Sequence, residues 1–202
     1  MIILVTMRTV ENPGYSETRD AISHDWGRFF QRFDLTPILV PNAVDDVERF
    51  FRLGAAGLLL TGGDDLGPAG SPTARDRTEA GMLEGAIRLR LPVFGTCRGL
   101  QMINCYFGGS LRRELPEKHV GEHAVCVKDV GMLRVNSFHN QGVVSDGVAP
   151  ELEAFAQTDS GVVEAVRHCS LPITAVQWHP ERFNPAADFD QKLISEWLAQ
   201  CA

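Results

Sequence analysis

A chain of 202 residues, 44% hydrophobic and 22% charged, has the composition of a soluble globular protein, and we expect one domain over residues 1–202. The net charge of −7 argues against general binding to nucleic acid or to anionic membranes, because both require clustered Lys and Arg. No apolar run reaches the roughly 20 residues of a membrane span, and the N-terminus lacks the basic flank of a signal peptide, so we expect a cytoplasmic protein.

Four short apolar runs in the first half of the chain predict buried strands. They cover residues 2–5, 37–40, 57–61 and 92–95. Continuous apolar runs suit strands that are covered on both faces, as in parallel sheets. Helical spacing of apolar residues predicts amphipathic helices over 16–33 and 73–90, which would serve as crossovers between these strands.

After residue 109 the pattern changes to shorter alternating runs, which predict antiparallel strands joined by Gly-containing turns. These runs cover residues 124–128, 132–136, 153–157 and 162–167. A last apolar run over 173–177 precedes a predicted C-terminal helix over 187–200. We therefore expect an α/β fold that is doubly wound and flavodoxin-like, with a mainly parallel central sheet and an antiparallel extension.

The segment Gly95-Thr96-Cys97-Arg98-Gly99 lies where a predicted buried strand enters an apolar helix. G-x-C-x-G at such a junction is the arrangement of a nucleophile elbow with Cys in place of Ser, and the two glycines permit a sharp turn. The helix N-terminus favours thiolate over thiol, and its free amides, beginning with that of Arg98, are placed to stabilise an oxyanion. The alternative is an ordinary buried cysteine, which the two glycines and the junction disfavour.

A thiol nucleophile needs a base, and the segment 176–181 offers one directly after the last predicted core strand. His179 would take the thiol proton and later protonate the leaving amine, while Glu181 would hold the imidazole in the required tautomer. Taken alone, His-Pro-Glu at a strand end is typical of a solvated loop. The motif indicates a catalytic base because it occurs together with the predicted nucleophile Cys97.

The remaining cysteines and histidines predict no further chemistry. An odd number of cysteines without a C-x-x-C pair favours free thiols in a reducing compartment; they are Cys97, Cys105, Cys126, Cys169 and Cys201. His119 and His123, with Glu117 and Glu122 nearby, suggest a metal site. However, Gly121 between them predicts a loop, and no third ligand follows at a recognised spacing, so we expect no bound metal.

Two strings, Gly95-Thr96-Cys97-Arg98-Gly99-Leu100-Gln101 and Gln177-Trp178-His179-Pro180-Glu181, lie about 80 residues apart and together resemble the class I glutamine amidotransferase-like superfamily. The strings over 60–65 and 135–141 resemble its glycine-rich loop and its substrate loop, and they point to the γ-glutamyl hydrolase (peptidase C26-like) branch. The resemblance implies a Cys-His-Glu triad of Cys97, His179 and Glu181, and no cofactor.

The same resemblance implies roles for residues around the triad. Gly63 and Arg98 would supply the amides of an oxyanion hole, and Gln101 would contact the glutamyl group. Ser137 and Phe138 would hold its α-amino and α-carboxylate ends.

For several positions near the predicted site, two interpretations stay open. A plain tight turn is the alternative for Gly62-Gly63, and His139 is expected to be structural or to lie beside the substrate. Arg8 and Arg19 follow the first predicted strand, beyond whose carboxyl end ligands bind in open α/β folds. They are candidates for an anionic part of the substrate, with a solvated loop as the alternative.

Arg8 and the pattern from Arg19-Asp20 to Trp26 also resemble small stand-alone members that release an amide-type product from a γ-glutamyl nucleotide during capsule phosphoramidate synthesis. We therefore expect Cys97 to attack a γ-glutamyl amide of a small molecule, with release of glutamate and an amine or amidate. A glutaminase subunit that delivers ammonia to a partner synthetase is the first alternative. A non-catalytic ligand-binding protein that keeps the fold is the second.

Overall fold

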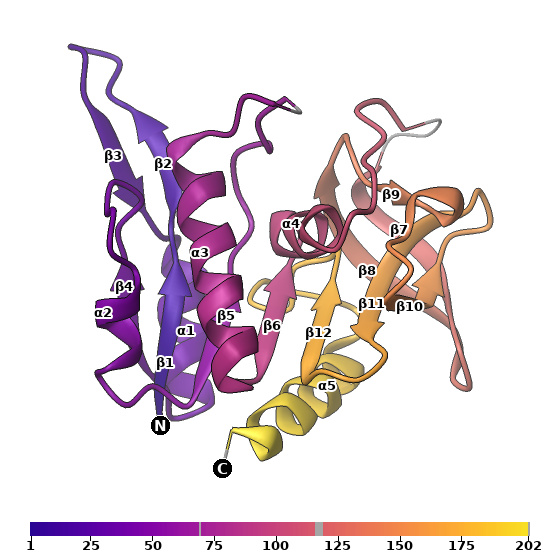
Figure 1. Cartoon of the computed structure of the whole chain (residues 1–202). Coiled ribbons are helices and arrows are strands. Elements are labelled where there is room, and N and C mark those ends of the chain that lie inside the picture. Colours follow the sequence, from indigo (N-terminus) through magenta and orange to yellow (C-terminus); the bar gives the residue numbers. More distant parts are fainter. Residues whose placement is uncertain (69, 116–118, 202) are drawn as a thin grey trace.

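The computed structural model describes residues 1–68, 70–115 and 119–201. Five strands form the parallel half of one large sheet, and they lie in the order β4-β1-β5-β6-β12 (Figure 1). Their bounds are β1 (Ile2–Thr6), β4 (Thr36–Val40), β5 (Gly57–Leu60), β6 (Val93–Thr96) and β12 (Ile173–Val176). Every neighbouring pair among them is parallel. The strands predicted from the apolar runs are thereby confirmed.

The sheet continues from β12 in antiparallel pairs through β11, β10, β7 and β8. These strands are β7 (His119–Val127), β8 (Gly131–His139), β10 (Leu152–Gln157) and β11 (Val162–His168). The short strand β9 (Val143–Val144) also pairs with β11, and the 3-10 helix η1 (Ser145–Gly147) follows it. The predicted architecture, a mainly parallel sheet with an antiparallel extension, is confirmed.

Helices cover both faces of the parallel half (Figure 1). They are α1 (His24–Arg32), α2 (Glu48–Phe51), α3 (Ala74–Leu89), α4 (Arg98–Tyr106) and α5 (Ala187–Gln200). Side chains alternate along a strand, so Ile3 and Val5 pack with α1 and α5, whereas Leu4 packs with α3 and α4 on the opposite face. Among the described residues, no helix has the length and apolar character of a membrane span.

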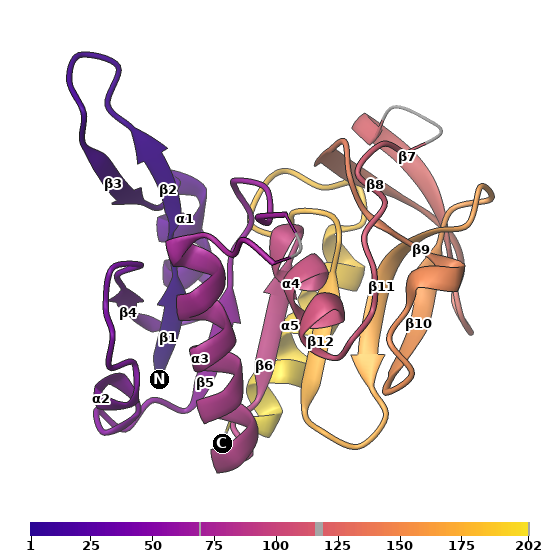
Figure 2. The same ribbon diagram turned by 45° about the horizontal axis from the view of Figure 1, so that its top comes forward.

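The helix predicted over 16–33 is wrong in its first part, because the helix begins at His24. Residues Thr18–Ala21 form strand β3, which pairs antiparallel with β2 (Arg8–Glu11) in a separate two-stranded sheet. The turn between them contains Pro13 and Gly14, and the amide of Gly14 donates to the side chain of Asn12. This β2–β3 hairpin projects beyond the carboxyl end of β1 (Figure 2).

The loop predicted around His119 and His123 is also wrong. Both residues belong to β7, which pairs with β8 from His119↔His139 to Val127↔Gly131, so this long ladder passes through Gly121. Glu117, which was considered beside them as a metal ligand, lies outside the described residues.

The docking of α5 on the sheet predicts a large loss of stability for Trp197→Ala. Trp197 is buried, and its ring centroid lies 5.6 Å from that of Phe94 on β6. Removing the indole should lower the free energy of unfolding by about 3–5 kcal/mol, measured by urea denaturation. The exposed Leu53→Ala should cost less than about 0.5 kcal/mol, and an equal loss in both variants would contradict this packing.

Candidate active site

Cys97 lies at the carboxyl edge of the parallel sheet, between the end of β6 and the start of α4 at Arg98. Its backbone has φ 53° and ψ −103°, outside the regions that helices and strands occupy. A non-glycine residue in such a conformation is strained and persists only where the surrounding structure holds it. The amide of Cys97 donates to the carbonyl of Val176 at 2.7 Å, which fixes the turn against β12.

The glycines on either side of the turn serve close packing. A Cβ on Gly99 would lie 2.5 Å from the carbonyl oxygen of Leu60, and one on Gly95 would lie 2.9 Å from the backbone of Gly99. Neither glycine has a positive φ, so the strained residue of the elbow is Cys97 itself. The glycines therefore allow α4 to approach β5 and β6 closely.

His179 and Glu181 follow β12 and are buried beside Cys97. The Nδ1 atom of His179 lies 2.7 Å from Oε1 of Glu181, and the ring shares a side-chain hydrogen bond with Cys97. Burial lowers the pKa of His179, but the charge of Glu181 and the hydrogen bonds to Cys97 and Glu181 outweigh this and raise the pKa to about 9. The imidazole therefore holds a proton readily at neutral pH.

The loop that carries His179 is fixed by two residues that the sequence did not single out. Asn136 on β8 accepts from the amide of His179 at 2.8 Å and donates to the carbonyls of His179 and Phe183. Asp190 on α5 accepts from the indole of Trp178 at 2.7 Å and from the side chain of Asn184 at 2.6 Å. The string over 135–141 thus holds the histidine as well as bordering the site.

Three glutamine side chains connect the substrate loop with Cys97. Gln101 and Gln141 exchange hydrogen bonds, and Gln101 also contacts the side chain of Gln177. The amide nitrogen of Gln177 lies 3.5 Å from the sulfur of Cys97. The structure therefore brings Gln101 into the same polar network as the cysteine.

The residues predicted in the substrate loop have different environments. Ser137 is fully buried in β8, whereas Phe138 is half exposed and packs edge-on against the ring of His179 at 5.5 Å between centroids. His139 is buried, with Nδ1 3.0 Å from the carbonyl of Gln141 and Nε2 3.5 Å from the buried Glu164. Phe138 thus contacts the ring of His179 directly.

The Gly62-Gly63 segment after β5 lies against the cysteine and the histidine. A Cβ on Gly62 would be 2.8 Å from Cε1 of His179 and 3.4 Å from Cβ of Cys97. Gly63 has φ 137°, a conformation that favours glycine, and a Cβ there would meet Arg8 and Arg75 at 2.7 Å. Any side chain in this segment would therefore displace the neighbouring groups.

A pocket beside His179 contains one of the two arginines predicted to bind substrate. Arg8 lines it together with Gly63, Trp26, Glu181 and Arg182. Arg19 does not line it: its guanidinium donates to Tyr15 and Glu17 on the exposed hairpin. Arg182, which sequence reasoning missed, directly follows His-Pro-Glu and stacks over Phe138 at 4.5 Å.

Comparisons with known proteins identify a family and several relatives. A family model described as Peptidase C26 matches residues 2–181. A relative named gamma-glutamyl-CDP-amidate hydrolase, from Campylobacter jejuni, is 28% identical over 98% of each chain. The gamma-glutamyl-gamma-aminobutyrate hydrolase of Escherichia coli is 33% identical over 63% of this chain and 60% of that protein. A solved glutamine amidotransferase from Thermotoga maritima has a TM-score of 0.68 at 12% identity, over 98% of this chain and 80% of that one, which shows a common fold.

The contact between His179 and Glu181 predicts that Glu181→Gln lowers the pKa of His179 from about 9, because the variant removes the neighbouring negative charge. Histidine-ring NMR of labelled protein across pH 5–10 measures this pKa. The folded value exceeds the usual 6.5, so the stability from protonated His179 is full below pH 6.5 and is lost as the pH rises through 9. The variant should therefore show a shallower fall in unfolding free energy over that interval.

Glu151→Gln provides the matched control, because the exposed Glu151 lies near another histidine, His168, at 3.8 Å. It should leave the titration of His179 unchanged. A His179 that titrates near 6.5 in the wild type would contradict the electrostatic role of Glu181.

Proposed function

The chain belongs to the peptidase C26 family, and from this we propose that it is a cysteine hydrolase that cleaves a γ-glutamyl amide of a small molecule. The observation that carries the proposal is the contact of Cys97, His179 and Glu181 at the carboxyl edge of the parallel sheet. Relatives named as γ-glutamyl hydrolases support the proposal that the cleaved bond is a γ-glutamyl amide. In this proposal the three residues form a catalytic triad.

The chemistry proceeds through a thioester. The proton of the Cys97 thiol lies on His179 before the attack, and the sulfur then attacks the γ-carbonyl carbon while the oxyanion binds the amides of Gly63 and Arg98. His179 then gives the proton to the leaving nitrogen as the C–N bond breaks. Water, deprotonated by His179, attacks the thioester, and glutamate leaves with the sulfur as thiolate and the proton on His179. Glu181 keeps the imidazole oriented and stabilises its charged form throughout.

On the glutamyl side, the proposal assigns binding to residues near the glutamine network. Gln101 would contact the glutamyl group, and Ser137 and Phe138 would hold its α-amino and α-carboxylate ends. His139, held by the carbonyl of Gln141 and by Glu164, would support this loop from behind. Because Ser137 is buried and Phe138 is half exposed, the proposal assigns the accessible wall of this subsite to Phe138.

On the leaving-group side, we propose that an anionic group binds Arg8 and Arg182. Both line the pocket beside His179, and long cationic side chains at its rim favour phosphate or carboxylate over a neutral amine. The relative named gamma-glutamyl-CDP-amidate hydrolase matches over nearly the whole chain. A γ-glutamyl nucleotide amidate, as used in capsule phosphoramidate synthesis, is accordingly the proposed substrate class.

The test of function is glutamate release by wild type and Cys97→Ala from free glutamine, γ-glutamyl amines and γ-glutamyl nucleotides. We expect wild type to have its highest kcat/KM on a γ-glutamyl nucleotide, and Cys97→Ala to lose at least about 10³-fold of the activity. Release from glutamine alone, or only with a synthetase partner added, would instead assign a glutaminase subunit. An alkylatable Cys97 without turnover of any compound would assign a binding protein.

The leaving-group proposal predicts a selective effect of charge. Arg8→Gln should raise KM for an anionic γ-glutamyl compound by about tenfold, because it removes a charge-assisted hydrogen bond, and should leave KM for a neutral γ-glutamyl amine nearly unchanged. Arg19→Gln is the matched control, since Arg19 is held on the hairpin away from the pocket. An equal rise for both compounds would contradict an anionic subsite.

A further inference from the structure

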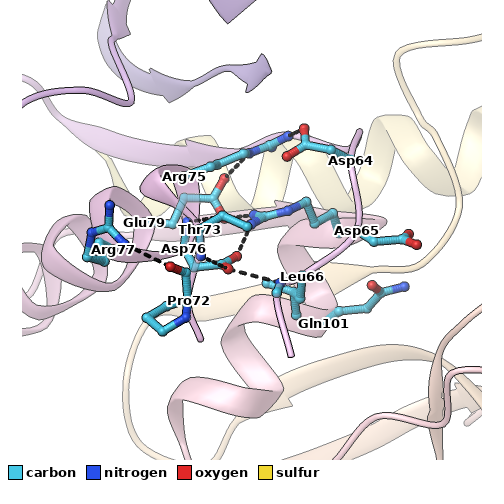
Figure 3. A network of polar contacts seen from close by, with 12 residues as sticks. Asp64, Asp65, Leu66, Pro72, Thr73, Arg75, Asp76, Arg77, Glu79 and Gln101 are labelled. Atoms are coloured by element: carbon cyan, nitrogen blue, oxygen red, sulfur yellow. Dashed lines mark hydrogen bonds and ion pairs between the residues drawn. The ribbon is translucent and has the colours of Figure 1, made fainter. Parts of the chain in front are cut away.

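Behind the reactive groups lies a cluster of five charged side chains that the reaction above does not use. It consists of Asp64, Arg75, Asp76, Glu79 and Arg98, and Figure 3 shows how its members on α3 approach the loop after β5. Arg75, Glu79 and Arg98 are almost completely buried. Buried charges are costly unless they are paired and hydrogen-bonded, so a cluster of this size calls for a reason.

Arg75 holds the backbone of the Gly62-Gly63 segment. Its Nη2 donates to the carbonyl of Thr61 at 2.7 Å and to that of Gly62 at 3.2 Å, while Nη1 donates to Asp64 at 2.7 Å. The Gly62–Gly63 peptide bond is trans, and in a planar trans peptide the C=O and the N–H point in opposite directions. By binding the carbonyl of Gly62, Arg75 therefore turns the amide of Gly63 away from itself.

Arg98 holds the other amide of the proposed oxyanion hole. Its backbone N–H is the first of α4, directly after Cys97, and its side chain forms ion pairs with Glu79 and Asp76 on α3. Asp76 in turn accepts from the amides of Thr73 and Gly67, so it is anchored at the N-terminus of α3. The first turn of α4 is thus tied to α3 by its own first side chain.

Glu79 links Arg75 to Arg98. Its Oε1 accepts from Nε of Arg75 at 2.9 Å and from the hydroxyl of Thr6 at 2.8 Å, and its Oε2 accepts from Arg98. A single carboxylate therefore contacts both arginines, and each arginine fixes the backbone next to one proposed oxyanion donor. Burial opposes the charge on Arg75, but Glu79 and Asp64 outweigh it and raise the pKa of Arg75, so the guanidinium stays charged.

We propose that Glu79 is a positioning residue that, through Arg75 and Arg98, holds the amides of Gly63 and Arg98 at the spacing an oxyanion requires. This inference rests on the proposed function, because it assumes that these amides stabilise a tetrahedral intermediate. Oxyanion donors are effective only when they are fixed before the reaction, since a donor that must reorient loses part of its stabilisation. A buried carboxylate whose two oxygens bind two different arginines, each also paired with a second carboxylate, provides such rigidity.

A merely structural role for the cluster predicts a different outcome. Loss of packing or stability would alter the whole site, including access to Cys97 and its reactivity. Loss of oxyanion positioning alone would lower kcat and spare KM, because the interaction is made only in the transition state. It would also spare alkylation of Cys97 by iodoacetamide, a displacement at a saturated carbon that forms no oxyanion.

The deciding variants are Glu79→Gln, which removes the charge that joins the arginines, and Arg75→Lys, which keeps a cation but loses the forked donors to Thr61 and Gly62. In each folded variant we expect kcat for glutamate release to fall about 100-fold, the loss typical of one oxyanion donor. KM and the rate of iodoacetamide alkylation should stay within about threefold of wild type. If Glu79→Gln does not fold, Arg75→Lys decides.

Glu48→Gln is the matched control, because Glu48 pairs with Arg88 on the surface and carries the same charge change. It should leave kcat unchanged. The inference is overturned if folded Arg75→Lys keeps kcat within about twofold of wild type, or if alkylation falls in parallel with kcat.

The wild-type assay separates the two possible failures. If wild type releases no glutamate from any γ-glutamyl compound, the proposed function fails. The positioning of the amides of Gly63 and Arg98 by Glu79 and Arg75 is then tested by ¹⁵N relaxation of these two amides. We then expect the order parameter of Gly63 to fall from about 0.85 to below about 0.6 in Arg75→Lys. An unchanged value would overturn the inference without reference to any substrate.

Discussion

One ladder of parallel backbone pairs, between β6 and β12, determines where the reactive groups meet. Val93 to Thr96 are in register with Ile173 to Val176, so the two strands end at the same level of the sheet. The hydrogen bond from the amide of Cys97 to the carbonyl of Val176 extends this ladder by one step. Residues about 80 positions apart in the chain therefore leave the sheet side by side. A change in the register between β6 and β12 would move the sulfur of Cys97 away from the imidazole of His179, even with both side chains unchanged.

The two halves of the sheet contribute different kinds of support to this junction. The parallel half provides the strained turn at Cys97 and the glycine segment after β5. The antiparallel half provides Asn136, whose side chain binds the backbone of His179 on both its amide and its carbonyl. The histidine is therefore held from a strand that plays no part in forming the cysteine turn. Strain at Cys97 is tolerated because both sides of the site are fixed independently.

Local patterns in the sequence were sufficient for the buried strands, for α3 to α5 and for the strand-to-helix junction at Cys97, because burial, capping and close packing act over a few residues. They failed at Thr18–Ala21, because the apolar residues that follow have helical spacing and predicted a helix over a segment that instead pairs with β2. They also missed Asn136 and Arg182, whose contacts depend on chain segments far apart. Arg75 and Glu79 lie on a helix that looks amphipathic in sequence, and nothing local shows that their charges are buried.

The hairpin formed by β2 and β3 is a separate two-stranded sheet, and its base, at Arg8 and Ala21, borders the pocket beside His179. Its turn can lengthen or shorten without shifting any strand of the main sheet. Residues of the hairpin beyond Arg8 and Ala21 can therefore change in number while Cys97, His179 and Glu181 keep their positions. An insertion in this turn would thus add surface next to the pocket without altering the strands that lead to Cys97 and His179.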